Sequence, residues 1–237
     1  MQKKQNCVWI TGANSGIGKS ITHQFAKSDI FCVASARRKD ALVRMKDEVS
    51  EISNNIEIFP LDISSSDEIS DVSKKILKKY DIDCLINNAG ITTFTAAEDD
   101  SIEDVIAIIQ INLIGSIATI QSLIPHFKKR GCGIIINILS VVATKVLKNS
   151  SIYSASKAGL LTYANVLREE VRKYNIKVIN ILPGATKTPI WSSEMLNKYA
   201  NKMMSPDDLA KFIYHIYTLD SNLVPEEITI RPIGGDL

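Results

Sequence analysis

Tyr153 and Lys157 are four positions apart in the stretch YSASK, with only small residues between them. On a helix, positions i and i+4 lie on one face, so the two side chains would be neighbours. An unperturbed phenol has a pKa of about 10 and is poorly matched to proton transfer at neutral pH. A lysine cation about 4 Å away, at an effective dielectric constant of about 20, would favour the phenolate by at most about 4 kcal/mol. The pair therefore predicts a general acid or base with a lowered pKa, whereas Tyr153 alone would be a half-buried aromatic residue.

An acid or base of this kind needs a second group that holds and polarises the substrate oxygen. Ser140, in the stretch NILSVVA, lies at the carboxyl end of an apolar run and 13 residues before Tyr153. A hydroxyl there would lie on the same rim of the predicted sheet as the glycine-rich stretch TGANSGIGKS near the N-terminus. Taken alone, Ser140 would be an ordinary turn residue at the end of a strand.

Short apolar runs alternate with longer amphipathic segments along the whole chain. Strands are predicted at 7–10, 30–35, 56–60, 83–87, 133–139, 177–182 and 228–232. Helices are predicted at 17–28, 39–53, 66–80, 100–128, 152–174 and 206–219. The strands are nearly continuous in Val, Ile, Leu and Cys, which is typical of parallel strands covered on both faces. The alternation predicts a single α/β domain over 1–237, with a Rossmann-type, doubly wound, mostly parallel seven-stranded sheet flanked by helices.

The composition is that of an ordinary soluble globular protein. Of the 237 residues, 45% are hydrophobic and 23% are charged, and the net charge is +2. This charge gives no overall attraction to nucleic acid, so no nucleic-acid partner is expected. The chain has no run of 18 uncharged apolar residues and no signal-peptide pattern, so no membrane association is expected. The four cysteines are widely spaced, which favours buried reduced thiols over disulfides or a metal site and predicts a cytoplasmic location.

The stretch TGANSGIGKS follows the first predicted strand and opens the first predicted helix. Glycine there permits a tight turn and lets the backbone approach a pyrophosphate without interfering Cβ atoms. The helix N-terminus adds unpaired N–H groups and a partial positive charge. The alternative is an ordinary strand–turn–helix junction. The predicted dinucleotide contacts in this stretch are Gly12, Asn14, Ser15, Gly16, Ile17 and Gly18.

Thr11 and the glycines at 12, 16 and 18 form the pattern T-G-x-x-x-G-x-G, which resembles the fingerprint of the short-chain dehydrogenase/reductases. The common Rossmann spacing G-x-G-x-x-G is absent, because three residues separate the first two glycines. The resemblance extends over nearly the whole chain, from Thr11 to Gly235.

The resemblance implies a role for each residue of the predicted catalytic set. Ser140 would hydrogen-bond the substrate carbonyl, and Tyr153 would exchange the proton. Lys157 would tune Tyr153 and bind the nicotinamide ribose. Asn112, in INLIG, matches the family's asparagine that holds a water next to the lysine. Together they imply hydride transfer between a nicotinamide and a carbonyl or secondary alcohol, with no metal.

The end of the second predicted strand indicates which dinucleotide binds. An acidic residue there binds the ribose hydroxyls and repels a 2′-phosphate, whereas arginine binds that phosphate. In VASARRKD, Ala36 stands where the acid is expected, and Arg37 and Arg38 follow it. The pattern predicts NADP(H), with Ser35 able to add a hydroxyl. The alternative is that the basic residues begin a solvated helix, and Asp40 is close enough to complicate the assignment.

Further dinucleotide contacts are predicted after later strands, because the carboxyl ends of parallel strands form the ligand-binding edge of such sheets. The stretches FPLDIS, NNAG and LPGATKT stand at these positions. Asp62 would cap a turn or, by the family resemblance, contact the adenine. NNAG is itself a family motif, and Thr188 matches the residue that bonds the nicotinamide carboxamide. The predicted contacts are Asp62, Ile63, Asn88, Ala89, Gly90, Tyr153, Lys157, Pro183, Gly184 and Thr188, with the Pro–Gly pair in a turn.

Residues 189–208 are predicted to form a short lid over the substrate or, equally, a helix packed on the domain. The segment is rich in Met and contains Trp191, which suits an adaptable cover over an apolar substrate. Phe94 and residues 146–147 would line other walls of a mostly apolar pocket. Lysines near this pocket would suit an acidic substrate or a carrier protein.

The sequence therefore predicts an NADP(H)-dependent short-chain oxidoreductase that acts on a small carbonyl or alcohol substrate. NNAGIT is also similar to 3-oxoacyl-carrier-protein reductases, although the ending VPEEITIRP departs from theirs. A 3-hydroxy acid dehydrogenase and a general carbonyl reductase stay open as alternatives. A non-catalytic nucleotide-binding regulator is less favoured, because the catalytic set is intact. The predicted helices 100–128 and 152–174 resemble those that pair family members, so a homodimer or homotetramer is expected.

Overall fold

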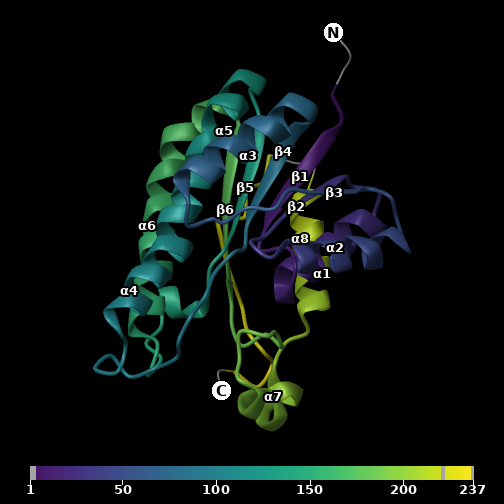
Figure 1. Ribbon diagram of the computed structural model, residues 1–237. Coiled ribbons are helices and arrows are strands. Elements are labelled where there is room, and N and C mark those ends of the chain that lie inside the picture. The colour runs from purple at the N-terminus through teal and green to yellow at the C-terminus, as the bar shows by residue number, and fades with distance from the viewer. Residues whose placement is uncertain (1–3, 220–221, 236–237) are drawn as a thin grey trace.

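The computed structural model describes residues 4–219 and 222–235 and contains a seven-stranded sheet between two layers of helices (Figure 1). The strand order is β3-β2-β1-β4-β5-β6-β7, and every neighbouring pair is parallel. The strands are β1 (Asn6–Thr11), β2 (Cys32–Ser35), β3 (Ile56–Ile58), β4 (Asp81–Asn87), β5 (Gly133–Ile138), β6 (Ile176–Pro183) and β7 (Glu227–Ile230). The predicted doubly wound, parallel Rossmann-type fold is confirmed.

Helices cover both faces of the sheet. They are α1 (Gly16–Lys27), α2 (Lys39–Ser50), α3 (Ser66–Lys79), α4 (Ile102–Ile109), α5 (Ser116–Arg130), α6 (Ser151–Val171), α7 (Ser193–Tyr199) and α8 (Pro206–Tyr217). One core cluster lies between the sheet and α1, α2 and α8, and a second lies between the sheet and α3, α5 and α6 (Figure 1). Alternate residues of β1 serve the two clusters: Val8 and Ile10 face the first, and Cys7 and Trp9 face the second. Burial on both faces explains why the strands are continuously apolar.

The predicted helix at 100–128 is wrong in its middle part. Helix α4 ends at Ile109, a π-helical segment follows over Gln110–Gly115, and α5 then continues to Arg130. At Gly115 a Cβ would lie 2.4 Å from the carbonyl oxygen of Ile63, so only glycine lets the helix approach the loop after β3 this closely. The other predicted elements differ from the observed ones by a few residues at their ends. Pro183, predicted in a turn, is instead the last residue of β6.

The helical stretch Ile102–Arg130 is long and apolar enough to cross a membrane when judged by length and composition alone. Polar residues such as Gln110 and Asn112 interrupt it, so it contains no run of 18 apolar residues. About a third of its most apolar window (33%) is buried. Ile102 and Ile106 are 62% and 61% exposed, so α4 presents an apolar face that none of the described residues covers.

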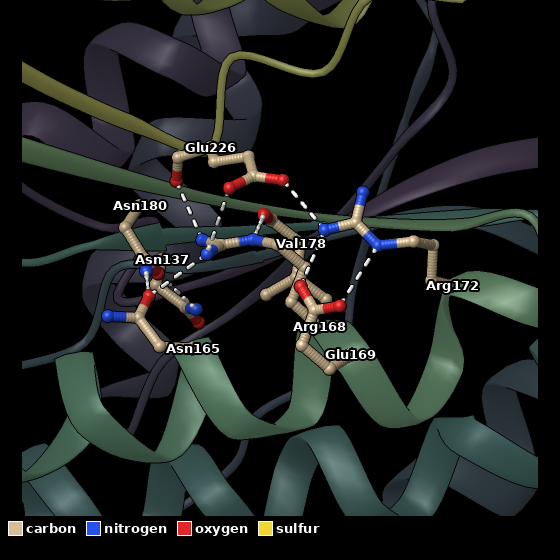
Figure 2. Close-up of polar contacts among 8 residues, drawn as sticks. All are labelled: Asn137, Asn165, Arg168, Glu169, Arg172, Val178, Asn180 and Glu226. Atoms are coloured by element: carbon tan, nitrogen blue, oxygen red, sulfur yellow. Dashed lines mark hydrogen bonds and ion pairs between the residues drawn. The ribbon is translucent and has the colours of Figure 1, made fainter.

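A buried arginine ties α6 to the far edge of the sheet (Figure 2). Arg168 is 7% exposed, and its Nε donates to the Val178 carbonyl oxygen at 2.9 Å. Its Nη2 donates to the Glu226 carbonyl oxygen at 2.8 Å, just before β7. On the surface, Arg172 binds the Glu226 carboxylate at 2.8 Å. These bonds join α6, β6 and the approach to β7 into one unit.

A row of hydrogen-bonded asparagine side chains extends this network from α6 across neighbouring strands of the sheet. The Nδ2 of Asn180 donates to Asn165 of α6 at 3.1 Å, and the Nδ2 of Asn137 donates to Asn180 at 3.0 Å. Asn87 in turn donates to Asn137 at 3.2 Å. Asn87, Asn137 and Asn180 are buried, and the hydrogen bonds that link β4, β5, β6 and α6 offset much of the cost of their desolvation. The Oδ1 of Asn87 has no partner among the described residues.

Candidate active site

A cavity of about 490 Å³ lies along the carboxyl ends of the strands. Such edges are where ligands bind in parallel α/β sheets. Fifteen of the predicted dinucleotide contacts line it: Gly12, Asn14, Ser15, Gly16, Ile17, Arg37, Arg38, Asp62, Ile63, Asn88, Ala89, Gly90, Tyr153, Lys157 and Thr188. The structure therefore brings residues from six separate stretches of the sequence to one site.

Three predicted contacts do not line this cavity. Gly18 packs inside the loop, where a Cβ would lie 2.3 Å from the Gly12 carbonyl oxygen. Pro183 lies within β6, and the N–H of Gly184 donates to the Ile230 carbonyl oxygen at 2.7 Å. These residues shape the framework of the site through backbone packing.

Hydrogen bonds connect the glycine-rich loop to the NNAG stretch. Gly12 and Gly16 have φ angles of 63° and 53°, a left-handed conformation that favours glycine. The amide of Asn88 donates to the Gly12 carbonyl oxygen at 3.1 Å. A Cβ on Gly12 would lie 2.8 Å from the Cα of Ala89. The two motifs therefore support each other before any ligand binds.

Thr11 is a structural residue that the sequence analysis did not assign to the site. Its hydroxyl accepts the backbone N–H of Asn88 at 3.1 Å and that of Ala89 at 3.2 Å. Other lining residues also went unpredicted. Thr92 lines the cavity, and its buried hydroxyl has no partner among the residues that the structure describes.

The end of β2 carries positive charge into the cavity. Ala36 lines the cavity at the position where an acidic residue would repel a 2′-phosphate. The exposed Arg37 and Arg38 follow it in the sequence and also line the cavity. Asp40 is bound to Arg44 at 2.9 Å, so it does not compete for the two arginines. Ser35 was predicted to offer its hydroxyl to the 2′-phosphate. That hydroxyl is buried and already accepts the indole N–H of Trp9 at 2.9 Å, which limits this role.

Asp62 both forms a turn and lines the cavity. Its Oδ1 accepts the backbone N–H of Ser64 at 3.0 Å and the Ser64 hydroxyl at 2.7 Å. Burial opposes its ionisation, but these hydrogen bonds and the charge of Arg37 outweigh that effect and lower the pKa of the carboxyl. Asp62 can therefore cap the turn and still be placed to contact a ligand in the cavity.

Tyr153 lies in the third residue position of α6 and is 8% exposed. Burial raises the pKa of its phenol to about 12, and a hydrogen bond with the Ser140 side chain opposes that rise. The expected lowering of the Tyr153 pKa is therefore wrong for the ligand-free site, because desolvation outweighs every stabilisation of the phenolate. Ser140 does lie at the end of β5 beside Tyr153, as predicted.

Lys157 is 3% exposed and lies one turn further along α6. Its Nζ donates to the carbonyl oxygen of Ile138 at 3.0 Å and lies 5.8 Å from the centroid of the Tyr153 ring. Burial lowers the pKa of Lys157 to about 8. The ammonium is thus held at the cavity wall beside the Tyr153 ring.

Asn112 lies in the π-helical segment and is fully buried. Its Oδ1 accepts the N–H of Ile91 at 2.8 Å, and its Nδ2 donates to the Ile91 carbonyl oxygen at 2.9 Å. The same Nδ2 donates to the hydroxyl of Ser156, 3.1 Å away on α6. Asn112 therefore fixes the chain after NNAG against the helix that carries Tyr153 and Lys157. The predicted water contact stays a prediction.

The predicted lid region forms a loop with an anchored base. The N–H of Lys187 donates to the Met204 carbonyl oxygen at 2.9 Å, and the N–H of Met204 donates to Ala185 at 2.9 Å. Between these points, α7 and the 3-10 turn Ala200–Lys202 contain no buried residue. The segment therefore contains a short helix outside the domain core, with Met195, Leu196 and Tyr199 half-buried.

The remaining chemistry-bearing side chains lie elsewhere. His23, His126 and His215 are on α1, α5 and α8. Three of the cysteines are buried, whereas Cys132 is exposed in the loop after α5, so the expectation of burial is wrong for Cys132. Within the described ranges, no group of three or more His, Cys, Asp or Glu side chains is arranged to hold a metal ion.

The chain is similar in sequence to known oxidoreductases. The model of the family described as short chain dehydrogenase matches residues 6–198. Sepiapterin reductase of Chlorobaculum tepidum is 33% identical over 236 residues, which cover 96% of each chain. An oxidoreductase of Staphylococcus haemolyticus is 29% identical over 225 residues, which cover 94% of this chain and 96% of its own.

Solved structures resemble the fold over nearly its full length. The closed form of serine dehydrogenase complexed with NADP+ has a TM-score of 0.90 at 25% identity and covers 98% of this chain and 96% of its own. ElxO with NADP bound has a TM-score of 0.88 at 25% identity and covers 97% of this chain and 98% of its own.

Proposed function

The chain belongs to the short-chain dehydrogenase family, and we propose that it is an NADP(H)-dependent enzyme that interconverts a carbonyl and a secondary alcohol. One observation carries the proposal. Tyr153 and Lys157 line the same cavity as the glycine-rich loop and the arginines after β2. A proton donor and a dinucleotide cradle therefore share one continuous space, which is what hydride transfer requires.

Proton transfer falls to Tyr153. When bound, NADPH would supply the hydride that adds to the carbonyl carbon and would be left as NADP+. With its pKa raised to about 12, Tyr153 is protonated at neutral pH, which is the form needed for reduction. Its phenolic proton goes to the carbonyl oxygen, so the C=O group becomes CH–OH and a phenolate remains. Ser140, which hydrogen-bonds to Tyr153, donates to the same developing oxyanion.

Lys157 and Asn112 act on Tyr153 through position and charge. The Lys157 ammonium at the cavity wall stabilises the phenolate formed in the reaction and can hydrogen-bond a ribose hydroxyl. Asn112 holds the peptide of Ile91 and the Ser156 hydroxyl, and the Ser156 hydroxyl donates to the Tyr153 carbonyl oxygen at 2.7 Å. We assign Asn112 as a positioning residue on these contacts.

The preference for NADP(H) rests on the charges at the end of β2. Among the described residues that line the cavity, Asp62 is the only acidic one, and it is held by Ser64. Arg37 and Arg38 are exposed at the cavity rim, where guanidinium groups suit a 2′-phosphate. The two solved structures named above also carry NADP+ or NADP, which supports the assignment.

The substrate is proposed only as a class. The names of the relatives, sepiapterin reductase and serine dehydrogenase, indicate different substrates, so they support a carbonyl or alcohol group and nothing finer. A 3-oxoacyl thioester and a 3-oxo acid stay as alternatives. The intact set of Ser140, Tyr153 and Lys157 argues against a non-catalytic regulator.

We also propose that the chain is a single domain that assembles as a homodimer or homotetramer in the cytoplasm. The uncovered apolar face of α4, with Ile102 and Ile106, together with Val166 of α6, which is 58% exposed, supports self-association. The buried free thiols support a reducing compartment. The short lid at 189–208 is part of the same domain.

The test is NADPH oxidation against a panel of ketones, 3-oxoacyl thioesters and 3-oxo acids, repeated with NADH. We expect turnover of at least one carbonyl class, with a higher kcat/KM for NADPH than for NADH. A preference for NADH would contradict the assignment of Arg37 and Arg38. No turnover of any carbonyl, with NADPH still bound, would favour the regulator.

A further inference from the structure

Phe94 and Trp191 form an aromatic pair beside Tyr153, although they come from different segments. Phe94 lies in the loop between β4 and α4, and Trp191 lies at the start of the lid. Their ring centroids are 4.7 Å apart, and the ring planes are within 6° of parallel. The Phe94 ring also meets the Tyr153 ring edge-on, at 6.1 Å and 69°. The pair therefore stands directly beside the proposed proton donor.

The backbone that presents Phe94 is strained and specifically held. Phe94 has a φ angle of 54°, a left-handed conformation that is unfavourable for a bulky side chain. The hydroxyls of its neighbours Thr93 and Thr95 both donate to the carboxylate of Asp100, the former at 2.7 Å. These hydrogen bonds from Thr95 and Thr93 lower the pKa of Asp100. Strain that is maintained in this way beside the proposed proton donor indicates a function for the residue so placed.

Trp191 lies at the start of a segment that has few buried contacts. Its indole N–H donates to the Thr186 carbonyl oxygen at 3.0 Å. The helix that follows, α7, has no buried residue, and few buried contacts mean that a segment opens at low cost. Phe94 is thus the fixed side of the pair, and Trp191 is the side that can move with the lid.

We propose that Phe94 and Trp191 form an aromatic clamp that selects substrates whose carbonyl group is attached to a flat aromatic ring. The inference rests on the proposed function and narrows its substrate class. In the ligand-free protein the two rings stack on each other. A flat ring enters between them when Trp191 moves outward, and each of its faces then stacks on one of the two side chains. The attached carbonyl is thereby brought to Tyr153.

The kinetic test compares two ketones with the same carbon skeleton, phenyl methyl ketone and cyclohexyl methyl ketone. The measured quantity is the ratio of their kcat/KM values, so intrinsic differences in ketone reactivity cancel between variants. We expect Trp191→Leu and Phe94→Leu each to lower the ratio of phenyl to cyclohexyl ketone by about tenfold, the upper range for one aromatic contact. Phe212→Leu, on the exposed side of α8, is the matched control and should leave the ratio unchanged. An unchanged ratio in both clamp variants would overturn the proposal.

The hydrogen bonds to Asp100 provide a second test that spares both rings. The double variant Thr93→Val/Thr95→Val keeps the shape of the side chains but removes both donors to Asp100. It should lower the phenyl to cyclohexyl ratio, and Thr93→Ser/Thr95→Ser should restore it. A merely structural role would reduce both kcat/KM values equally, and that result would contradict the role of Asp100 in the clamp.

Binding can be followed without catalysis through tryptophan fluorescence. The chain contains Trp9, which is fully buried, and Trp191. We expect 1-phenylethanol to quench the fluorescence of the unmodified protein far more than 1-cyclohexylethanol does, and Trp191→Phe to abolish the difference. The same quenching in Trp191→Phe would place the ligand elsewhere and overturn the clamp. If neither ketone is reduced but this difference is seen, the proposed function fails while the clamp stands.

Discussion

The Nζ atom of Lys157 lies 5.8 Å from the centroid of the Tyr153 ring and donates to the Ile138 carbonyl oxygen at 3.0 Å. The lysine is therefore anchored to β5, and its charge is buried in the ligand-free protein. Burial lowers its pKa from 10.5 to about 8, which means that the charged form destabilises the fold. The buried Lys157 ammonium, which is proposed to serve the reaction, therefore lowers the free energy of unfolding.

Replacing Lys157 by Met should stabilise the protein at pH 7 by about 2 kcal/mol, the charge effect less one lost hydrogen bond. The folded pKa lies below the unfolded one, so between about pH 8 and pH 10.5 the unfolded chain binds more protons. The stability of the unmodified protein therefore rises with pH across this window, and the advantage of Lys157→Met shrinks there. Urea unfolding at several pH values measures this, and a pH-independent difference would contradict it.

At the other end of the sheet, the buried charge of Asp83 should make the stability of the fold fall with rising pH, which is the opposite of the effect of Lys157. Burial raises its pKa to about 6, and its Oδ1 has no hydrogen-bond partner in the described part of the chain. The cost of its charge is absent below pH 3.8 and complete above about pH 6. Asp83→Asn should therefore stabilise the protein at pH 7.5 by about 2 kcal/mol and have little effect near pH 4. Thermal unfolding with the exposed Asp71→Asn as control measures the effect, and equal shifts for both variants would refute it.

The strands were predictable because burial on both faces makes most of their positions apolar, as β1 shows with Val8 and Ile10 on one side and Cys7 and Trp9 on the other. The π-helical segment was not predictable, because its apolar residues continue the pattern of the flanking helices. Its cause is long-range: Asn112 binds Ile91, and Gly115 lies against Ile63.

The same distinction applies to the site. Spacing places Tyr153 and Lys157 on one face of α6, and motif positions bring both to the cavity. Residue spacing cannot predict the side-chain conformation that directs Lys157 to the Ile138 carbonyl oxygen. It also cannot predict the desolvation that raises the pKa of Tyr153. Phe94 was predicted to line a wall, but its left-handed backbone and its stacking on Trp191 depend on tertiary contacts.

Arg37 and Arg38 should determine the choice of dinucleotide. In the double variant Arg37→Ala/Arg38→Ala, the KM for NADPH should rise by about 100-fold, because two charge-assisted hydrogen bonds to a phosphate are lost. The KM for NADH should change little. Steady-state kinetics with both dinucleotides measures this, with Arg44→Ala as the control because Arg44 binds Asp40. Equal losses for the two dinucleotides would contradict the assignment.

Arg168 should be essential to stability, in contrast to its neighbour Arg172 (Figure 2). Arg168→Met removes the Arg168 donor to the carbonyl oxygens of Val178 and Glu226, of which the latter keeps the Asn180 N–H at 2.9 Å. It also removes a buried charge network, and we expect a loss of about 3 kcal/mol. Arg172→Met removes surface ion pairs and should cost less than about 1 kcal/mol. Chemical denaturation of the two variants measures the difference, and similar losses would show that the buried network is not what holds α6 to β6.

The most direct measurement of the central claim is the single-turnover rate of ketone reduction by Tyr153→Phe with saturating NADPH. The variant keeps the ring that contacts Phe94 but has no proton to donate. The account predicts a rate lower by about 1000-fold, within the usual range for general acid catalysis, while NADPH binding measured by fluorescence stays within about threefold. A rate within about tenfold of the unmodified enzyme would contradict the assignment of Tyr153 as the proton donor.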